Sequence, residues 1–435
     1  MAMTDWTIIR RSMGARLFST VTTVVTVAVA VALMLVLLSM RDAGQRAFER
    51  GGGNMHILMS RDADPLTAIL NNVFYARPPR NWILWHEYER LAAKWPFEFA
   101  IPTQQGDSYR GYPVLATTPE FFTKFEAVPG RPWRAAEGRV FSEDFEATLG
   151  AEAARSTGLR IGDKIVLTHG TPDSRAADAH VHDEYAFTVV GTLEPTGTSH
   201  DRAVFTSLRS AWIIHAHDRI EADRAKEGSG SGEHAHGPLV TEKDLTPEDK
   251  KLTGIYLRVA GRGGASSALL PQAFEALRRE PTFVAANPAQ EIGNLFRIIG
   301  NINQVLVGMA AVVMVSSGIA IMLALYNSME QRRRQIAVLR VLGCSRPRVF
   351  GLVVTESAVL GLVGAAAGVL LAMAGAWVVA WIMRQRLGLV IDPGLTLVWV
   401  LAVAMGTVAL AAVAGLVPAV MAYRTSVARN LRPLG

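Results

Sequence analysis

The chain has 435 residues and a formal net charge of +6, and 50% of its residues are hydrophobic while 19% are charged. Its mean hydropathy of +0.22 is high for a soluble protein of this length and indicates membrane-spanning segments. The excess of positive charge lies beside the apolar runs and not on the large polar region between them, which argues against a nucleic-acid-binding protein.

Four stretches of the chain are apolar over the roughly 20 residues that a membrane-spanning helix needs. The apolar part of the first, residues 18–40, is longer than the core of about 7–15 residues found in signal peptides, and no clear small-x-small cleavage site follows it. We therefore expect an uncleaved membrane anchor there. The other spans are predicted within residues 288–326, 351–383 and 395–422.

Arginine residues mark one side of these spans. Three arginines precede the first span, six lie between the second and the third, and three follow the fourth, opposed only by Asp5 and Glu330. This asymmetry is the positive-inside pattern, and it sets the topology of the chain. The expected cytoplasmic segments are 1–17, 327–350 and 423–435, and the expected outer segments are 41–297 and 384–394.

The outer region, residues 41–297, is long enough to form one or two domains with their own core. No disulfide holds it, because the only cysteine of the chain, Cys344, lies in an expected cytoplasmic segment. Strand-like alternation and helical periodicity follow one another along this region, which predicts an α+β fold. The pattern changes near Pro129, so we expect two subdomains, with residues 129–255 inserted into the first. The predicted fold class is a membrane α-helical protein with four transmembrane helices and a large α+β domain outside the cytoplasm.

The polar sequence NPAQEIGNLFRIIGNINQ runs into the second span without a break. Asn287 is suited to capping a helix, and Pro288 suits its first position. A continuous helix from Pro288 to Tyr326 would be about 58 Å long, against about 30 Å for the hydrocarbon core of a bilayer. We expect its outer half to form a stalk that is weakest at Gly300 and Asn301.

The segment QRRRQIAVLRVLGCSRPRVF, residues 331–350, lies between the second and third spans. Its apolar residues are spaced to fall on one face of a short helix that Gly343 ends. Such a helix suits docking into a groove of a cytoplasmic partner. A basic interfacial helix that only fixes the topology is the alternative. The apolar residues are Ile336, Val338, Leu339 and Leu342.

All ten histidines lie in the outer region, and six of them form three His-x-His pairs. On an extended chain, residues i and i+2 point to one side, so each pair can chelate one ion. Imidazole suits zinc, copper or nickel, and neighbouring carboxylates can complete such a site, which favours zinc binding. A solvated polar loop without a ligand is the alternative, because no spacing matches a known structural zinc site. The pairs are His180 and His182, His215 and His217, and His234 and His236.

The sequence RRRQIAVLRVLGCSRPRVFGLVVTESAVLGLVGAAAGVLL resembles the coupling-helix region of ABC transporter permeases of the MacB, LolC/LolE and FtsX type. The likeness extends to the C-terminal GLVPAVMAYRTSVARNLRP. It also covers EATLGAEAARSTGLRIGDKIVL and YAFTVVGTLEPTGTSHDRAVFTSL, which are similar to the inserted subdomain of the MacB and LolC type. The resemblance implies a bacterial inner-membrane protein with its large domain in the periplasm, which assembles with a second permease and with cytoplasmic ATPases.

The resemblance also implies how the chain works. In this family the coupling helix fits a groove on the ATPase, and the movement drives export or release of a lipoprotein-, lipid- or drug-like cargo, with a periplasmic adaptor or lipoprotein as a further partner. This chain contains no GxxxxGK[ST] phosphate-binding loop, so we expect ATP on a separate partner chain and no catalytic residue here. The expected coupling residues are Arg334, Ile336, Val338, Leu339, Arg340, Leu342 and Gly343.

Two alternatives to export stay open. A permease of the FtsX type regulates a periplasmic enzyme, and the histidine pairs are compatible with a zinc-linked transport system.

Two features of the third span point to packing. Gly364 and Gly368 allow the close approach of another helix, either within the chain or across a dimer. Glu356 lies near the cytoplasmic end of this span, where an interfacial ion pair near Arg346 and Arg348 is expected.

Overall fold

The computed structural model describes residues 5–169, 181–226, 239–261, 268–341, 343–387 and 394–424. The chain divides into two compact units, which we call the membrane unit and the sheet unit. The membrane unit comprises Met1–Gly44, Ile298–Ile382 and Ile391–Gly435, and the sheet unit comprises Gln45–Arg297 and Met383–Val390.

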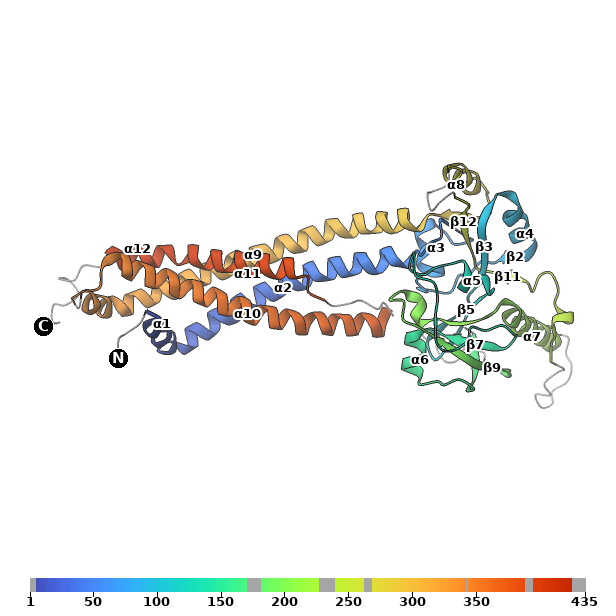
Figure 1. Cartoon of the computed structure of the whole chain (residues 1–435), viewed down its shortest axis with the longest axis horizontal. Helices are drawn as coiled ribbons and strands as arrows, with labels where there is room; N and C mark the ends of the chain where they lie inside the picture. Colours follow the sequence, from blue (N-terminus) through green and yellow to red (C-terminus); the bar gives the residue numbers. More distant parts are fainter. Residues whose placement is uncertain are drawn as a thin grey trace. The chain divides into compact units, whose positions relative to one another are not determined.

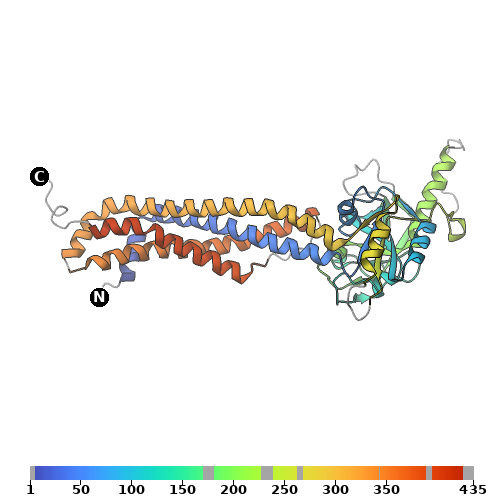
Figure 2. The same ribbon diagram turned by 90° about the horizontal axis from the view of Figure 1, so that it is seen from above.

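The described part of the chain contains four helices that are long and apolar enough to cross a membrane, which confirms the four predicted spans. In both views these helices run side by side (Figures 1 and 2). The spans are Leu17–Asp42, Pro288–Met329, Arg346–Ile382 and Leu397–Arg424. The helices that carry or flank them are α1 (Asp5–Gly14), α2 (Leu17–Gly51), α9 (Pro288–Val341), α10 (Arg346–Leu387), α11 (Leu397–Ala414) and α12 (Leu416–Arg424).

Helix α2 is the central element of the bundle core. Its residues Val27, Val31 and Leu35 are buried in one cluster with apolar side chains from the other spans, such as Leu325 of α9 and Leu360 of α10. Many residues on the outer faces of the bundle are large and apolar yet exposed in the isolated chain, as expected for surfaces that meet lipid.

Helix α9 is longer than the sequence predicts. It is unbroken over 54 residues, which corresponds to about 81 Å, and it passes Gly300 and Asn301 without interruption. It also continues beyond the apolar span to Val341. The basic segment expected to form a separate short helix is therefore the last part of α9, because no helix-breaking residue precedes Gly343 there.

The described residues of the sheet unit form an 11-stranded sheet and a separate two-stranded sheet of β2 and β11. The strands are β1 (Ile57–Ser60), β2 (Ile83–Leu84), β3 (Phe97–Gln104), β4 (Asp107–Tyr109), β5 (Tyr112–Thr117), β6 (Ala135–Gly138), β7 (Glu146–Leu149), β8 (Lys164–His169), β9 (Val181–Leu193), β10 (Val204–Ser207), β11 (Lys251–Leu252), β12 (Gly254–Val259) and β13 (Val284–Ala286). The helices are α3 (Pro65–Asn72), α4 (Trp85–Lys94), α5 (Glu120–Thr123), α6 (Ala151–Thr157), α7 (Leu208–Lys226) and α8 (Leu270–Arg278), with 3-10 turns η1 (Ser199–Arg202) and η2 (Glu242–Asp244).

The large sheet has an open half and a closed half. Its strand order is β10-β7-β9-β8-β4-β5-β3-β12-β1-β13, with β6 beside β9. Strand β10 also pairs in parallel with β5, which closes β5, β4, β8, β9, β7 and β10 into a ring. The strands of the expected insertion, residues 129–255, thus do not form a sheet of their own. They continue the sheet of the first part by pairing with β4 and β5.

The open half of the sheet is covered on both faces. Leu58 of β1 belongs to one apolar cluster, together with Phe121 and Tyr256, whereas its neighbours Ile57 and Met59 belong to another. Successive residues of a strand point to opposite faces, so two separate clusters along β1 mean two buried faces. The ring has a third cluster, which includes Phe187 and Ile214 of α7.

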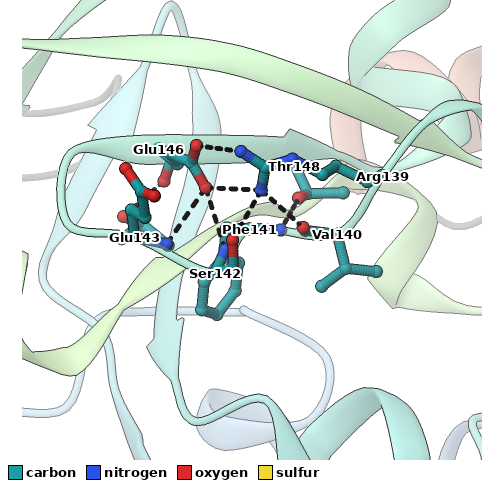
Figure 3. A network of polar contacts seen from close by, with 8 residues as sticks. Arg139, Val140, Phe141, Ser142, Glu143, Glu146 and Thr148 are labelled. Atoms are coloured by element: carbon teal, nitrogen blue, oxygen red, sulfur yellow. Dashed lines mark hydrogen bonds and ion pairs between the residues drawn. The ribbon is translucent and has the colours of Figure 1, made fainter.

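A hydrogen-bond network fixes the segment that joins β6 and β7 (Figure 3). The carboxylate of Glu146, at the start of β7, accepts hydrogen bonds from the guanidinium of Arg139 and from the backbone N–H groups of Ser142 and Glu143. The Arg139 guanidinium, helped by these N–H groups, lowers the pKa of Glu146 to about 2. The turn is therefore built around a carboxylate that stays ionised.

Candidate functional site

The structure describes only part of the expected histidine pairs. His180, His234 and His236 lie outside the described residues, as does the side chain of His182. His215 and His217 lie on helix α7, not on an extended segment. Side chains two positions apart on a helix diverge by about 200°, so the expected chelation of one ion by this pair is wrong. The two histidines instead enter two different clusters.

His215 belongs to a cluster with Asp107 and His169, which we call the Asp107 cluster. The Nδ1 atom of His169 lies 3.1 Å from one carboxylate oxygen of Asp107, and the Nε2 atom of His215 lies 3.2 Å from the other. The two imidazole rings meet edge to face, with 5.2 Å between their centroids. One carboxylate and two imidazoles thus converge from three elements.

Strand pairing brings this cluster together. Asp107 is the first residue of β4 and His169 is the last described residue of β8, and the antiparallel register places them directly opposite each other. Cross-strand partners have Cβ atoms about 5 Å apart, which brings their side chains into contact on one face. Helix α7 adds His215 from outside the sheet. The side chain of Asp107 is only 5% exposed, whereas that of His169 is 46% exposed and faces solvent.

His217 belongs to a second cluster, with Glu184 of β9 and Glu221 of α7. Its Nε2 atom lies 3.4 Å from a carboxylate oxygen of Glu221 and 4.0 Å from one of Glu184. The imidazole is 2% exposed and its ring meets that of Tyr185 edge to face. This cluster is more deeply buried than the Asp107 cluster, and its ligand atoms are farther apart.

The sequence did not point to Asp107, His169 or Glu221. His169 is isolated from other histidines in the sequence, and Asp107 is one of many acidic residues in the outer region. Only the register of β4 against β8 and the packing of α7 bring them to His215. The preceding Gly106 is a weak signal, because its backbone has a φ of 155°, a conformation that favours glycine.

The expected coupling residues divide into two groups at the end of α9. Ile336 is buried against Val349 and Val353 of α10 and Ala419 of α12, so it packs within the bundle and is not offered to a partner. Val338 is 44% exposed. Arg340 is half-buried, and the side chains of Arg334 and Leu339, together with the whole of Leu342, lie outside the described part of the chain.

Gly343 follows the end of α9 with a φ of 96°, and its N–H donates to the carbonyl of Arg340. This left-handed conformation is the expected helix stop, which a glycine adopts without a steric cost. Helix α10 then begins at Arg346.

Gly364 and Gly368 of α10 lie against α2. A Cβ at Gly364 would come within 2.5 Å of Val27, and one at Gly368 would come within 2.6 Å of Val31 and 2.8 Å of the carbonyl oxygen of Ala28. Of the two alternatives for these glycines, the structure thus shows packing between spans of one chain.

Glu356 is buried at the same end of the bundle as the basic segment. One of its carboxylate oxygens accepts a hydrogen bond from Ser12 at 2.6 Å and one from Arg16 at 3.0 Å. The ion pair expected near Arg346 and Arg348 is therefore made with an arginine that precedes the first span. It ties the N-terminal segment to α10.

Two family models match the chain and together account for most of it. Residues 20–229 match the MacB-like periplasmic core domain, and residues 307–427 match the FtsX-like permease C-terminal domain. The solved structures with detectable similarity include the crystal structure of the extracellular domain of the noncanonic ABC-type transporter YknZ from Gram-positive bacteria. That match has 7% identity and a TM-score of 0.27, and it covers 54% of this chain and 99% of that chain. No curated protein matches this sequence.

The two matched domains and the four apolar helices describe a multi-pass protein of the inner membrane with a large periplasmic domain. The matched regions contain strands β6 to β10 of the insertion and the segment that joins the second and third spans. The chain therefore belongs to the ABC transporter permeases of the MacB/FtsX type.

Proposed function

We propose that this chain couples ATP hydrolysis by a separate cytoplasmic ATPase to movement of its periplasmic domain, and so drives the export or release of a periplasmic or outer-leaflet cargo. The cargo class is lipoprotein-, lipid- or drug-like, and the working complex contains a second permease chain and a periplasmic adaptor or lipoprotein. The observation that carries this proposal is the continuity of α9, which runs unbroken from Pro288 in the sheet unit to Val341 beyond its span.

The end of α9 offers a surface for the ATPase. Val338 and Val341 are separated by three positions and so share a face of the helix, and they are 44% and 62% exposed. The arginine-rich sequence around them belongs on the cytoplasmic side, where lipid does not cover such side chains. An exposed apolar pair on a helix end suits a groove on a partner protein.

The same helix end is packed firmly into its own bundle. Ile336 and Met329 of α9 belong to one apolar cluster with Val349 and Val353 of α10 and with Ala419 of α12. A force on Val338 and Val341 would therefore act on the packed ends of three spans and would not bend a loose loop. Because interiors are close-packed and resist compression, this packing supports mechanical transmission along α9.

Three buried hydroxyl groups of the described bundle also support mechanical transmission over a channel. The hydroxyl groups of Ser317, Ser357 and Thr407, all buried, donate to carbonyl oxygens three or four positions earlier in their own helices. Hydroxyls satisfied in this way do not line an aqueous path, and intramembrane polar groups that serve transport normally face a cavity.

The test changes the exposed pair on α9. We expect Val338→Asp and Val341→Asp to reduce the ATPase retained by the permease, and its ATP hydrolysis, at least tenfold, because burying an unpaired carboxylate in an interface costs several kcal/mol. The complex is purified from its native membranes through a tag on the permease, and ATPase content and hydrolysis are measured per permease.

Leu239→Asp is the matched control, because Leu239 is an equally exposed apolar residue, at 57%, in the sheet unit. This variant should leave both the ATPase content and the ATP hydrolysis per permease unchanged. Normal ATPase content and hydrolysis in Val338→Asp would refute the coupling role of this helix end.

A further inference from the structure

We propose that Asp107, His169 and His215 form a binding site for a divalent ion of the zinc class on the periplasmic domain. The site is independent of the coupling role proposed above. It combines His215 from one of the sequence pairs with His169, which belongs to none of them.

The spacing of the ligand atoms fits such an ion. Bonds of about 2.0–2.2 Å from zinc to histidine nitrogen and carboxylate oxygen, arranged tetrahedrally, place neighbouring ligand atoms about 3.3–3.5 Å apart. The two nitrogen-to-oxygen distances here, 3.1 and 3.2 Å, reach the two different carboxylate oxygens of Asp107. A set of three ligand atoms, one from each residue, lies within 4.8 Å of one another. An ion between them requires only a small closing movement, which the half-exposed His169 can supply.

The chemistry of the ligands selects the class of ion. Two imidazoles and one carboxylate suit zinc, cobalt and related first-row ions, whereas calcium and magnesium prefer oxygen ligands alone. Three protein ligands leave one position for water or for a group from another molecule. His169 lies on the solvent side of the cluster, so an ion has a path to the buried Asp107.

A further carboxylate lies near the second ring nitrogen of one ligand. The Nδ1 atom of His215, on the far side of the ring from Asp107, lies 3.9 Å from a carboxylate oxygen of Asp218, one turn later on α7. Metal-bound histidines commonly present their second ring nitrogen to a carboxylate, which fixes the ring orientation and raises the basicity of the ligand.

The position of the site gives the ion a structural consequence. Asp107 and His169 come from β4 and β8, one of the pairings by which the inserted strands join the earlier ones, and His215 comes from α7. A bound ion would link the ring of strands to α7 next to the pairing of β4 with β8. The rival explanation is an ion pair between Asp107 and protonated histidines, without metal.

The experiment uses the full chain in detergent or nanodiscs, carrying no polyhistidine tag and stripped of metal with a chelator. Zinc and cobalt ions are titrated separately in competition with a chromophoric chelator. We expect an ion bound with micromolar or tighter affinity at this site, and visible absorption bands of four- or five-coordinate cobalt with nitrogen and oxygen ligands.

Single-residue variants test whether these three residues are the ones that bind the ion. His169→Gln should weaken zinc binding at least tenfold and remove the cobalt bands, and its exposed side chain makes the change safe for folding. His86→Gln, at an exposed histidine of α4, and His217→Gln, in the second cluster, should leave the bands unchanged. Asp107→Asn should act like His169→Gln, provided that the melting temperature of the stripped protein confirms folding.

Two results would overturn the proposal. The first is a wild-type chain that binds zinc no more tightly than about 100 μM, which would leave an ion pair only. The second is a folded His169→Gln protein that keeps the affinity and the cobalt bands of the wild type. Neither result bears on the ATPase-coupling experiment, so the two proposals fail separately.

Discussion

The membrane unit and the sheet unit achieve close packing in opposite ways. In the membrane unit, helices approach at residues without side chains, so that Gly364 and Gly368 let α10 lie directly on α2. In the sheet unit, large side chains fill the interior, and Phe121 alone meets several other aromatic rings in its cluster. Lipid provides no hydrophobic drive between helices, so contact area there depends on close approach, whereas water drives aromatic burial in the sheet unit.

The units also treat buried polar groups differently. The membrane unit pairs a buried carboxylate, Glu356, with Arg16 and Ser12 near the end of the bundle. The sheet unit contains His200, which is fully buried among aromatic rings and shares a 2.6 Å hydrogen bond with the hydroxyl of Tyr75. Burial lowers the pKa of His200 to about 3, so it is neutral in the folded protein. The following predictions test this contrast, from the largest effect to the smallest.

The largest loss of folding stability is expected from Gly368→Leu. A side chain there meets both Val31 and the carbonyl oxygen of Ala28, and backbone cannot move aside as a side chain can. We expect a loss of folded, monodisperse protein in detergent and a destabilisation of about 3 kcal/mol or more. Thermal unfolding, monitored by circular dichroism, measures this destabilisation.

Gly375→Leu on the same helix is the control for Gly368→Leu. A Cβ at Gly375 makes only an ordinary contact, 3.5 Å from Val36, so this variant should remain folded. Equal behaviour of the two variants would show that small residues do not set the distance between α10 and α2.

A pH dependence is expected from His200. Between its usual pKa of 6.5 and the folded value of about 3, the unfolded chain binds a proton that the folded chain does not. Stability from this group is therefore present above about pH 6.5 and is lost as pH falls, by up to about 1.4 kcal/mol per pH unit. The measurement is urea unfolding of the full chain between pH 7 and pH 4, followed by tryptophan fluorescence.

His200→Gln removes the titrating group and should flatten this slope, although it lowers stability at pH 7. His86→Gln, at an exposed histidine, should keep the wild-type slope. An unchanged slope in folded His200→Gln would mean that His200 does not titrate differently in the two states.

The smallest effect is expected from Glu146→Gln, at the turn between β6 and β7. The carboxylate accepts hydrogen bonds from Arg139, Ser142 and Glu143, and an amide cannot accept all of them, so we expect a loss of about 1–3 kcal/mol at pH 7. The folded pKa of about 2 lies below the usual 4.5, so the stabilisation is present above about pH 4.5 and is lost as pH falls towards 2.

The difference in unfolding free energy between wild type and Glu146→Gln should therefore shrink in acid, and urea unfolding at pH 7 and pH 3.5 measures it. The matched control is Glu120→Gln, which changes an exposed carboxylate on α5. A difference that stays constant with pH would show that the charge of Glu146 is not what stabilises the turn.

The sequence by itself determined the four spans, their orientation, the family and the position of the helix stop at Gly343. Each of these depends on residues that are neighbours in the chain. A span is a continuous apolar length, orientation is a local excess of arginine, and a left-handed helix stop is a property of glycine. Even the glycines of α10 could be identified as packing residues from their spacing alone, because small residues four positions apart share a helix face.

Only the tertiary structure decided which partners those residues meet. Asp107 and His169 are more than 60 positions apart in the chain and meet through the register of β4 and β8, while His215 joins them because α7 is a helix and not a strand. Ile336 looked equivalent to Val338 in the sequence, yet it packs on α10 and α12 while Val338 stays exposed. Periodicity shows that a residue lies on an apolar face, but register and packing between distant segments decide what that face contacts, because those contacts depend on the fold as a whole.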